Sequence, residues 1–252
     1  MGAELFEIPA NLLSFELTIA FLCLFFCAIV QGYSGFGGGL MIVPIMALLF
    51  GPVTGIALVS IPFFFGMLFI IPRAISHVNW REVLPLASIS SIAILIGQIF
   101  LLSADARNLK IAMGIFIIIF AILFLRNWKY SGKRNFMTRG LVGAAAGSVT
   151  GAFGIPGGPI AVMYYLSAPI EPKEQRANIV LTGFINTIVF IMGFIFHDVY
   201  NQVSIIESGS LVPAFIVGSI LGQYLFNVAP AKWFNKVNSV MLLMIGAVIT
   251  VL

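Results

Sequence analysis

Long apolar stretches recur from one end of this chain to the other, and they constrain its fold more than any other feature. A helix needs about 20 mainly apolar residues to cross the hydrocarbon core of a bilayer. Eight stretches come near that length, at about 12–32, 53–71, 84–102, 109–125, 139–152, 177–196, 208–226 and 237–252, and two shorter ones lie at about 39–50 and 158–168. The sequence therefore predicts an all-α polytopic membrane protein.

The composition excludes several classes of soluble protein. Of the 252 residues, 60% are hydrophobic and only 9% are charged, whereas soluble domains carry about 25% charged residues. The chain therefore has too few polar residues to form the surface of a cytosolic enzyme or a nucleic-acid-binding domain. The apolar stretches hold no cluster of His, Asp, Glu or nucleophilic side chains, and Cys23 and Cys27 have no His or carboxylate beside them. We expect no catalytic residue, no metal and no cofactor.

The basic residues predict an orientation. Segment 127–138 and its flanks Arg126 and Arg139 carry Lys and Arg but no acid, so the positive-inside rule makes this segment a cytoplasmic linker. If each short apolar piece returns the chain across the membrane, 11 of the 13 basic residues lie inside and both termini lie outside. The net charge of +4 then reflects insertion in the cell inner (plasma) membrane and not binding to nucleic acid.

A duplicated glycine pattern divides the chain into two halves. Gly32-x-x-Gly35-x-x-Gly38-Gly39 recurs as Gly151-x-x-Gly154-x-x-Gly157-Gly158, and Leu95-Ile96-Gly97-Gln98 recurs as Ile220-Leu221-Gly222-Gln223. With linker 127–138 between them, 1–126 and 139–252 form two transmembrane repeats of about five segments each. An odd number of segments inverts the second repeat relative to the first, as in many secondary transporters.

The glycine clusters predict helices broken near the middle of the membrane. Backbone leaves a helix inside a bilayer only where protein or a wet cavity surrounds it, and glycine lets a ligand approach the backbone. The short helices would begin near Gly39 and Gly158, the latter followed by Pro159. Two helix starts that converge on one point make an anion site without a charged side chain.

Polar side chains near the breaks complete the predicted site. Asn178, Thr182 and Asn186 follow an i, i+4, i+8 spacing, so they share one helix face that either lines a polar path or ties helices together. The residues predicted to bind the anion are Gln31, Ser34, Gly35, Gly37, Gly38, Gly39, Gly154, Gly157, Gly158, Asn178 and Thr182. No acid lies in the middle of a span, which argues against a carboxylate proton relay.

The two breaks resemble the signatures of a known family. Gly35-Phe-Gly-Gly-Gly-Leu-Met-Ile-Val-Pro44 and Gly151-Ala-Phe-Gly-Ile-Pro-Gly-Gly158 are similar to the duplicated motifs of the TauE/SafE sulfite exporters, and the similarity in length and hydropathy extends over essentially the whole chain. The second copy differs by carrying Pro156 and Pro159, which stiffens that break. The resemblance implies transport of small sulfur-containing anions such as sulfite, sulfonates and sulfoacetate.

We therefore expect a secondary transporter that moves a small anion, of sulfonate or sulfur oxyanion type, by alternating access. An anion channel with the breaks as its constriction is the first alternative, and a membrane protein without transport activity is another. The sequence leaves open the exact anion, the direction of transport, a coupling H⁺ or Na⁺, and a homodimer.

Overall fold

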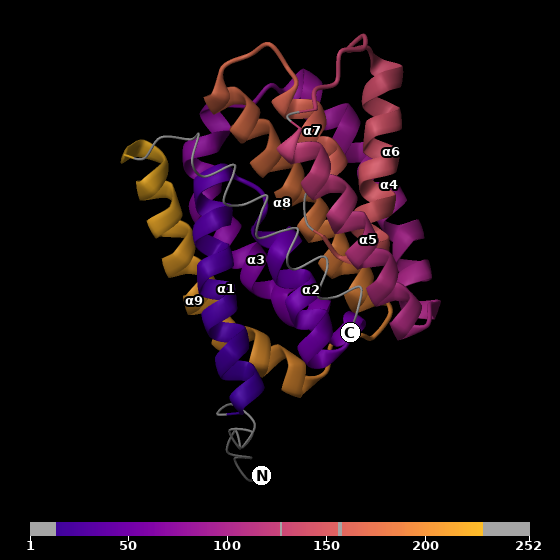
Figure 1. Ribbon diagram of the computed structural model, residues 1–252, viewed down its shortest axis with the longest axis vertical. Coiled ribbons are helices and arrows are strands. Elements are labelled where there is room, and N and C mark those ends of the chain that lie inside the picture. Colours follow the sequence, from indigo (N-terminus) through magenta and orange to yellow (C-terminus); the bar gives the residue numbers. More distant parts are fainter. Residues whose placement is uncertain (1–13, 127, 156–157, 229–252) are drawn as a thin grey trace, which may run out of the picture.

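The computed structural model describes residues 14–126, 128–155 and 158–228, and these form a bundle of helices (Figure 1). Most of the elements are long helices, and two short ones, α2 and α7, each follow a break in the chain. In chain order they are α1 (Phe15–Ser34), α2 (Gly38–Phe50), α3 (Pro52–Ala74), the 3-10 turn η2 (Ile75–His77), α4 (Trp80–Ser103), α5 (Ala106–Leu125), α6 (Phe136–Phe153), α7 (Pro159–Leu166), α8 (Pro172–Phe196) and α9 (Gln202–Val228).

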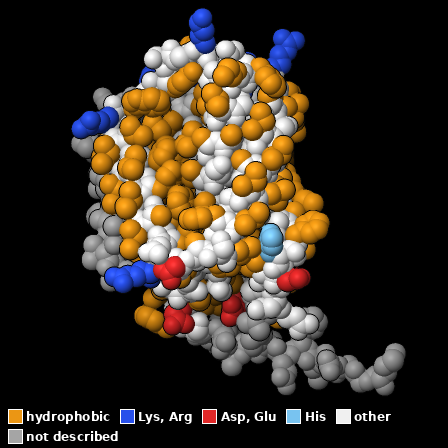
Figure 2. Space-filling model, turned by 90° about the vertical axis from the view of Figure 1, so that its right-hand side faces the viewer, with side chains coloured by type: hydrophobic (Ala, Val, Ile, Leu, Met, Phe, Trp, Pro, Cys, Tyr) orange, Lys and Arg blue, Asp and Glu red, His pale blue; other side chains and the backbone are white. Residues whose placement is uncertain are grey.

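Six helices in the described part of the chain are long and apolar enough to cross a membrane: α1, α3, α4, α5, α8 and α9. Their outward faces carry exposed Phe, Ile and Leu side chains, as lipid contact requires. Figure 2 shows this apolar surface over the middle of the molecule, with Lys and Arg toward the upper end and with acids, beside another basic side chain, at the lower end. The predicted all-α polytopic class is confirmed.

Six of the predicted spans coincide with these helices, and the helices extend beyond the apolar stretches. The predicted span at 139–152 forms α6, which is not among the six helices long and apolar enough to cross a membrane. Helix α8 starts at Pro172 rather than near residue 177, because proline suits the first turn of a helix and the polar residues that follow can stay in it. Helix α6 starts at Phe136, inside the predicted linker, with Asn135 as its cap. The last predicted span, 237–252, and the C-terminus lie outside the described residues.

Two helix pairs pack through glycine in the same way. Helix α9 lies along α1, and α4 lies along α6. A Cβ atom on Gly222 would lie 2.9 Å from the Cα atom of Gly32, and one on Gly97 would lie 2.9 Å from the Cα atom of Gly151. These are the glycines that the sequence pairs between its halves, so side chains at these positions are excluded by close backbone approach.

The second half runs opposite to the first where the two can be compared. Helix α1 begins at the lower end of the molecule, and α6 begins at the upper end (Figure 1). This arrangement is compatible with the predicted inverted repeat. The inverted repeat itself stays a prediction, because the fifth segment of the second half lies beyond the described residues.

Candidate functional site

The first break separates α1 from α2 and depends on two glycines with positive φ. Gly35 ends α1 at φ 81°, with its N–H donating to the Gln31 carbonyl oxygen at 2.8 Å. Gly37, at φ 89°, precedes the first residue of α2, Gly38, and no side chain caps this helix start. Because other residues rarely adopt these φ values, the glycines allow the chain to leave one helix and begin the next within three residues.

The side chains predicted to bind ligand at this break also brace its backbone. Gln31 is buried, and its Nε2 donates to the Gly35 carbonyl oxygen at 3.1 Å. Ser34 Oγ donates to the Val30 carbonyl oxygen at 2.8 Å and accepts from the Phe36 N–H at 3.2 Å. Both side chains form hydrogen bonds with backbone groups at the end of the broken helix. This structural role is compatible with an anion path beside them.

Gly38 and Gly39 are buried against the end of α1. A Cβ atom on Gly38 would lie only 2.4 Å from the Cys27 carbonyl oxygen, so this position cannot carry a side chain without moving the two helices apart. The start of α2 is therefore enclosed by protein on this side, as interrupted backbone in a membrane requires.

The second break, between α6 and α7, repeats this geometry. Gly154 ends α6 at φ 65°, with its N–H donating to the Thr150 carbonyl oxygen at 2.8 Å. Gly158 precedes α7 at φ 48°, and Pro159 takes the first helical position, where its missing N–H costs no hydrogen bond. Gly157, also predicted to contact the anion, lies outside the described residues.

Each break packs against a long helix of the opposite half. A Cβ atom on Gly35 would lie 3.1 Å from side-chain carbons of Arg176 and Val180, both on α8. A Cβ atom on Gly154 would lie 2.4 Å from a side-chain carbon of Ile56 on α3. Helices α3 and α8 also contact each other, so the long helices of both halves lie between the breaks.

The polar face of α8 is buried but not fully satisfied. Asn178 Oδ1 accepts from the Asn79 N–H at 2.8 Å, and Thr182 Oγ1 lies 2.9 Å from the Tyr165 hydroxyl. The Asn178 Nδ2 group and both amide atoms of Asn186 have no partner within the described part of the chain. Buried polar atoms of this kind call for a ligand or water, so this face provides both helix contacts and free polar groups.

A small cavity reaches the second break from the middle of the bundle. It has a volume of about 10 Å³ and is lined by Ile56, Val59, Ser60, Thr150, Gly154, Thr187 and Phe190. That volume holds about one water molecule, and the group such a water would bind is the buried Thr150 hydroxyl, which has no partner among the described residues. The cavity itself is too small for a larger ligand.

A larger cavity lies beside the first break, and the sequence reasoning missed it. Arg73, Lys173 and Arg176 are among the 11 basic residues that the positive-inside rule places in cytoplasmic loops, where their charge is explained by orientation alone. The structure brings them together around a space of about 140 Å³. These residues come from α3 and α8, in different halves, so no spacing in the sequence reveals that they converge.

The fold and this site define a polytopic helical membrane protein in which two interrupted helices face the long helices of the opposite half. The family profile described as "Sulfite exporter TauE/SafE" matches residues 20–249, so the chain belongs to this family. The family consists of membrane transporters of sulfite-like anions rather than enzymes. No curated protein and no solved structure matches the chain significantly.

Proposed function

We propose that this protein is a secondary transporter that moves a small sulfur oxyanion or sulfonate across the cell inner membrane by alternating access. Its membership of an anion exporter family supports the class of substrate. The observation that carries the mechanism is the contact of each glycine break with the opposite half, Gly35 with α8 and Gly154 with α3.

The mechanism follows from that arrangement. When one half of a transporter moves against the other, contacts between the halves are the ones that change. The two breaks and the polar face of α8 lie at these contacts, so their backbone N–H groups and the side chains of Asn178 and Thr182 can exchange partners with an anion. A cavity of about 140 Å³ lies beside the first break, whereas the one that reaches Gly154 has only about 10 Å³, and this difference supports access to the first break from one end of the protein.

Transport in proteoliposomes tests the proposal against its main alternative. Vesicles loaded with unlabelled sulfite are placed in ³⁵S-labelled sulfite, and uptake is measured with increasing outside concentration. A carrier gives saturable uptake that is accelerated by sulfite on the opposite side. A channel gives uptake that does not saturate in the same range and shows no such acceleration, and that result would replace the carrier mechanism with the channel.

The same vesicles determine coupling. A proton or sodium gradient is imposed in turn, with the membrane potential clamped by potassium and valinomycin. Accumulation of sulfite driven by one gradient identifies the coupling ion, and equal uptake under all gradients shows that the carrier is uncoupled.

A further inference from the structure

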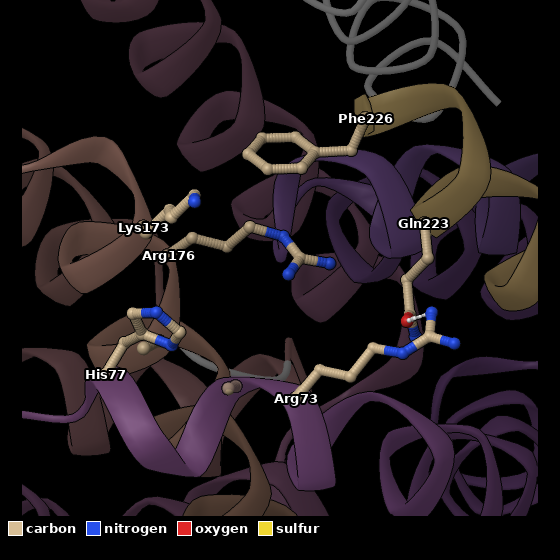
Figure 3. A pocket seen from close by; sticks show the side chains of 8 residues that line it. Arg73, His77, Lys173, Arg176, Gln223 and Phe226 are labelled. Carbon is tan, nitrogen blue, oxygen red and sulfur yellow. Dashed lines mark hydrogen bonds between the residues drawn. The ribbon is translucent and has the colours of Figure 1, made fainter. Parts of the chain in front are cut away.

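The cavity beside the first break is basic. It lies between the end of α3, the start of α8 and the end of α9, and its lining consists of Arg73, Ala74, His77, Lys173, Arg176, Ala177, Gln223 and Phe226. Figure 3 shows the Arg176 guanidinium group in the middle of this space, with Arg73 and Phe226 on opposite sides. At about 30 Å³ for each water in the liquid, a volume of this size corresponds to about five waters, which is enough for a small oxyanion and part of its hydration shell.

The positive charge in this cavity has no acidic partner among the described residues. Glu174, the nearest acid along α8, accepts from Asn79 Nδ2 at 3.0 Å. Glu82, which begins α4 at the same end of the bundle, is paired with Arg139 at 2.8 Å. Cations that share a confined space repel each other more strongly than in water, so an anion in the cavity would relieve this repulsion.

Both guanidinium groups keep donors available. Arg176 Nη2 donates to the Gly32 carbonyl oxygen at 2.6 Å, while its Nε is buried and has no partner in the part of the chain that the structure describes. Arg73 Nη1 donates to Gln223 Oε1 at 2.9 Å. A guanidinium group has five N–H donors in a planar fork that fits two oxygens of one oxyanion. Each arginine can therefore hold its present contact and still bind an anion.

The other half of the molecule shows that the fold does not need this arginine for packing. Gly35 and Gly154 occupy equivalent places in the duplicated motif. The side chains that pack against Gly35 are Arg176 and Val180. The side chain that packs against Gly154 is Ile56. An apolar side chain thus fills this place at the second break, and a buried cation is the more costly choice. A binding role explains that choice.

We propose that this cavity is a binding site for the transported anion, with Arg73 and Arg176 as its ligands and with a preference for doubly charged oxyanions over monocarboxylates. The inference rests on the proposed transport function and gives it a location. Because Arg176 also holds the Gly32 carbonyl oxygen in the last turn of α1, an anion that engages this side chain alters a contact of the first break. Binding would therefore bias the conformation of the break.

Anion binding to the purified full-length protein tests the site. Sulfite, sulfate, thiosulfate and acetate are titrated by isothermal calorimetry and by thermal unfolding in detergent. We expect a sulfur dianion to bind and acetate to bind at least tenfold more weakly. Arg176→Gln and Arg73→Gln should each weaken dianion binding at least tenfold. Arg176→Lys should fall between wild type and Arg176→Gln, since lysine keeps the charge but loses the fork.

The matched control is Arg81→Gln, which removes the same charge from an exposed side chain near the start of α4. It should bind the dianion as wild type does. If Arg176→Gln does not fold, Arg73→Gln still provides the test, because the Arg73 side chain is exposed and its one hydrogen bond is to Gln223. Dianion affinity within twofold of wild type in the arginine variants would overturn the site, as would a wild-type protein that binds none of the four anions.

Failure of the site and failure of the transport function give different results. If Arg73→Gln and Arg176→Gln exchange sulfite with an unchanged KM, the transporter stands and the cavity is not its binding site. If wild-type protein binds the dianion but proteoliposomes move no anion, the cavity stands and the transport function fails.

Discussion

Replacing Gly35 by alanine tests whether the first break takes part in transport, when a second alanine variant controls for the stability that the substitution costs. Gly35 has φ 81°, and Gly51, which joins α2 to α3, has φ 82°. The two differ in ψ: Gly35 has ψ −3°, in the left-handed region, where an L-residue costs about 1–2 kcal/mol. Gly51 has ψ 159°, in a region adopted almost only by glycine, where the cost is about 1–3 kcal/mol. Backbone strain alone should therefore cost Gly51→Ala at least as much stability as Gly35→Ala. They differ in surroundings: a Cβ atom on Gly35 meets Arg176 and Val180 at 3.1 Å, whereas one on Gly51 meets nothing within 4 Å.

The expected result follows from that difference. Gly35→Ala should unfold at a temperature lower by about 2–8 °C, since each kcal/mol corresponds to about 2–4 °C in a chain of this size, and Gly51→Ala by at least as much. If the break changes conformation during transport, 1–2 kcal/mol of strain in one state shifts the balance between states by about 5- to 30-fold. Sulfite exchange by Gly35→Ala should therefore slow by roughly that factor, while Gly51→Ala should stay within twofold of wild type.

The assay is sulfite exchange in proteoliposomes at equal protein content, with thermal unfolding of the same preparations. Equal rates in Gly35→Ala and wild type would show that the break does not take part in transport. An equal loss in both alanine variants would show that the rate follows stability alone. Either result would refute the assignment of the first break to the moving interface.

Three further outcomes are expected. Gly97→Ala should destabilise the protein by at least 2 kcal/mol, because its Cβ atom would lie 2.7 Å from the Ser148 carbonyl oxygen, whereas Gly209→Ala, in open space on α9, should not destabilise it; thermal unfolding compares them. Tyr200→Phe removes a 2.6 Å hydrogen bond to Ser60 and should cost about 1 kcal/mol. Burial raises the pKa of Tyr200 from 10.0 to about 12, and the Ser60 hydrogen bond offsets part of this rise. The neutral Tyr200 side chain should therefore contribute its full stability below about pH 10 and lose it as the pH rises to about 12. Unfolding scans of wild type and Tyr200→Phe over this pH range measure the difference. A protease site placed at either terminus should be cleaved from outside intact cells, and cleavage only after lysis would reverse the proposed orientation.

Local features of the sequence were sufficient for the class of fold and for the breaks. Hydropathy over some twenty residues predicts a membrane helix without reference to the rest of the chain, because each helix must satisfy its own backbone in lipid. Glycine and proline act through their own φ angles, so Gly35, Gly154 and Pro159 mark helix ends in sequence as they do in the structure. The duplication likewise pairs Gly97 with Gly222, and both prove to be close helix contacts.

Only the tertiary structure decided what the polar and charged side chains contact. The sequence around Gln31 and Ser34 is the same whether their side chains face a ligand or a carbonyl oxygen. In the structure both side chains donate hydrogen bonds to backbone carbonyl oxygens at the break. The positive-inside rule depends only on which loops carry Lys and Arg, so it explains the charges of Arg73 and Arg176 without a binding site. Their convergence on one cavity depends on how α3 and α8 pack. Packing between distant helices is set by shape complementarity over the whole bundle, and no local pattern in the sequence records it.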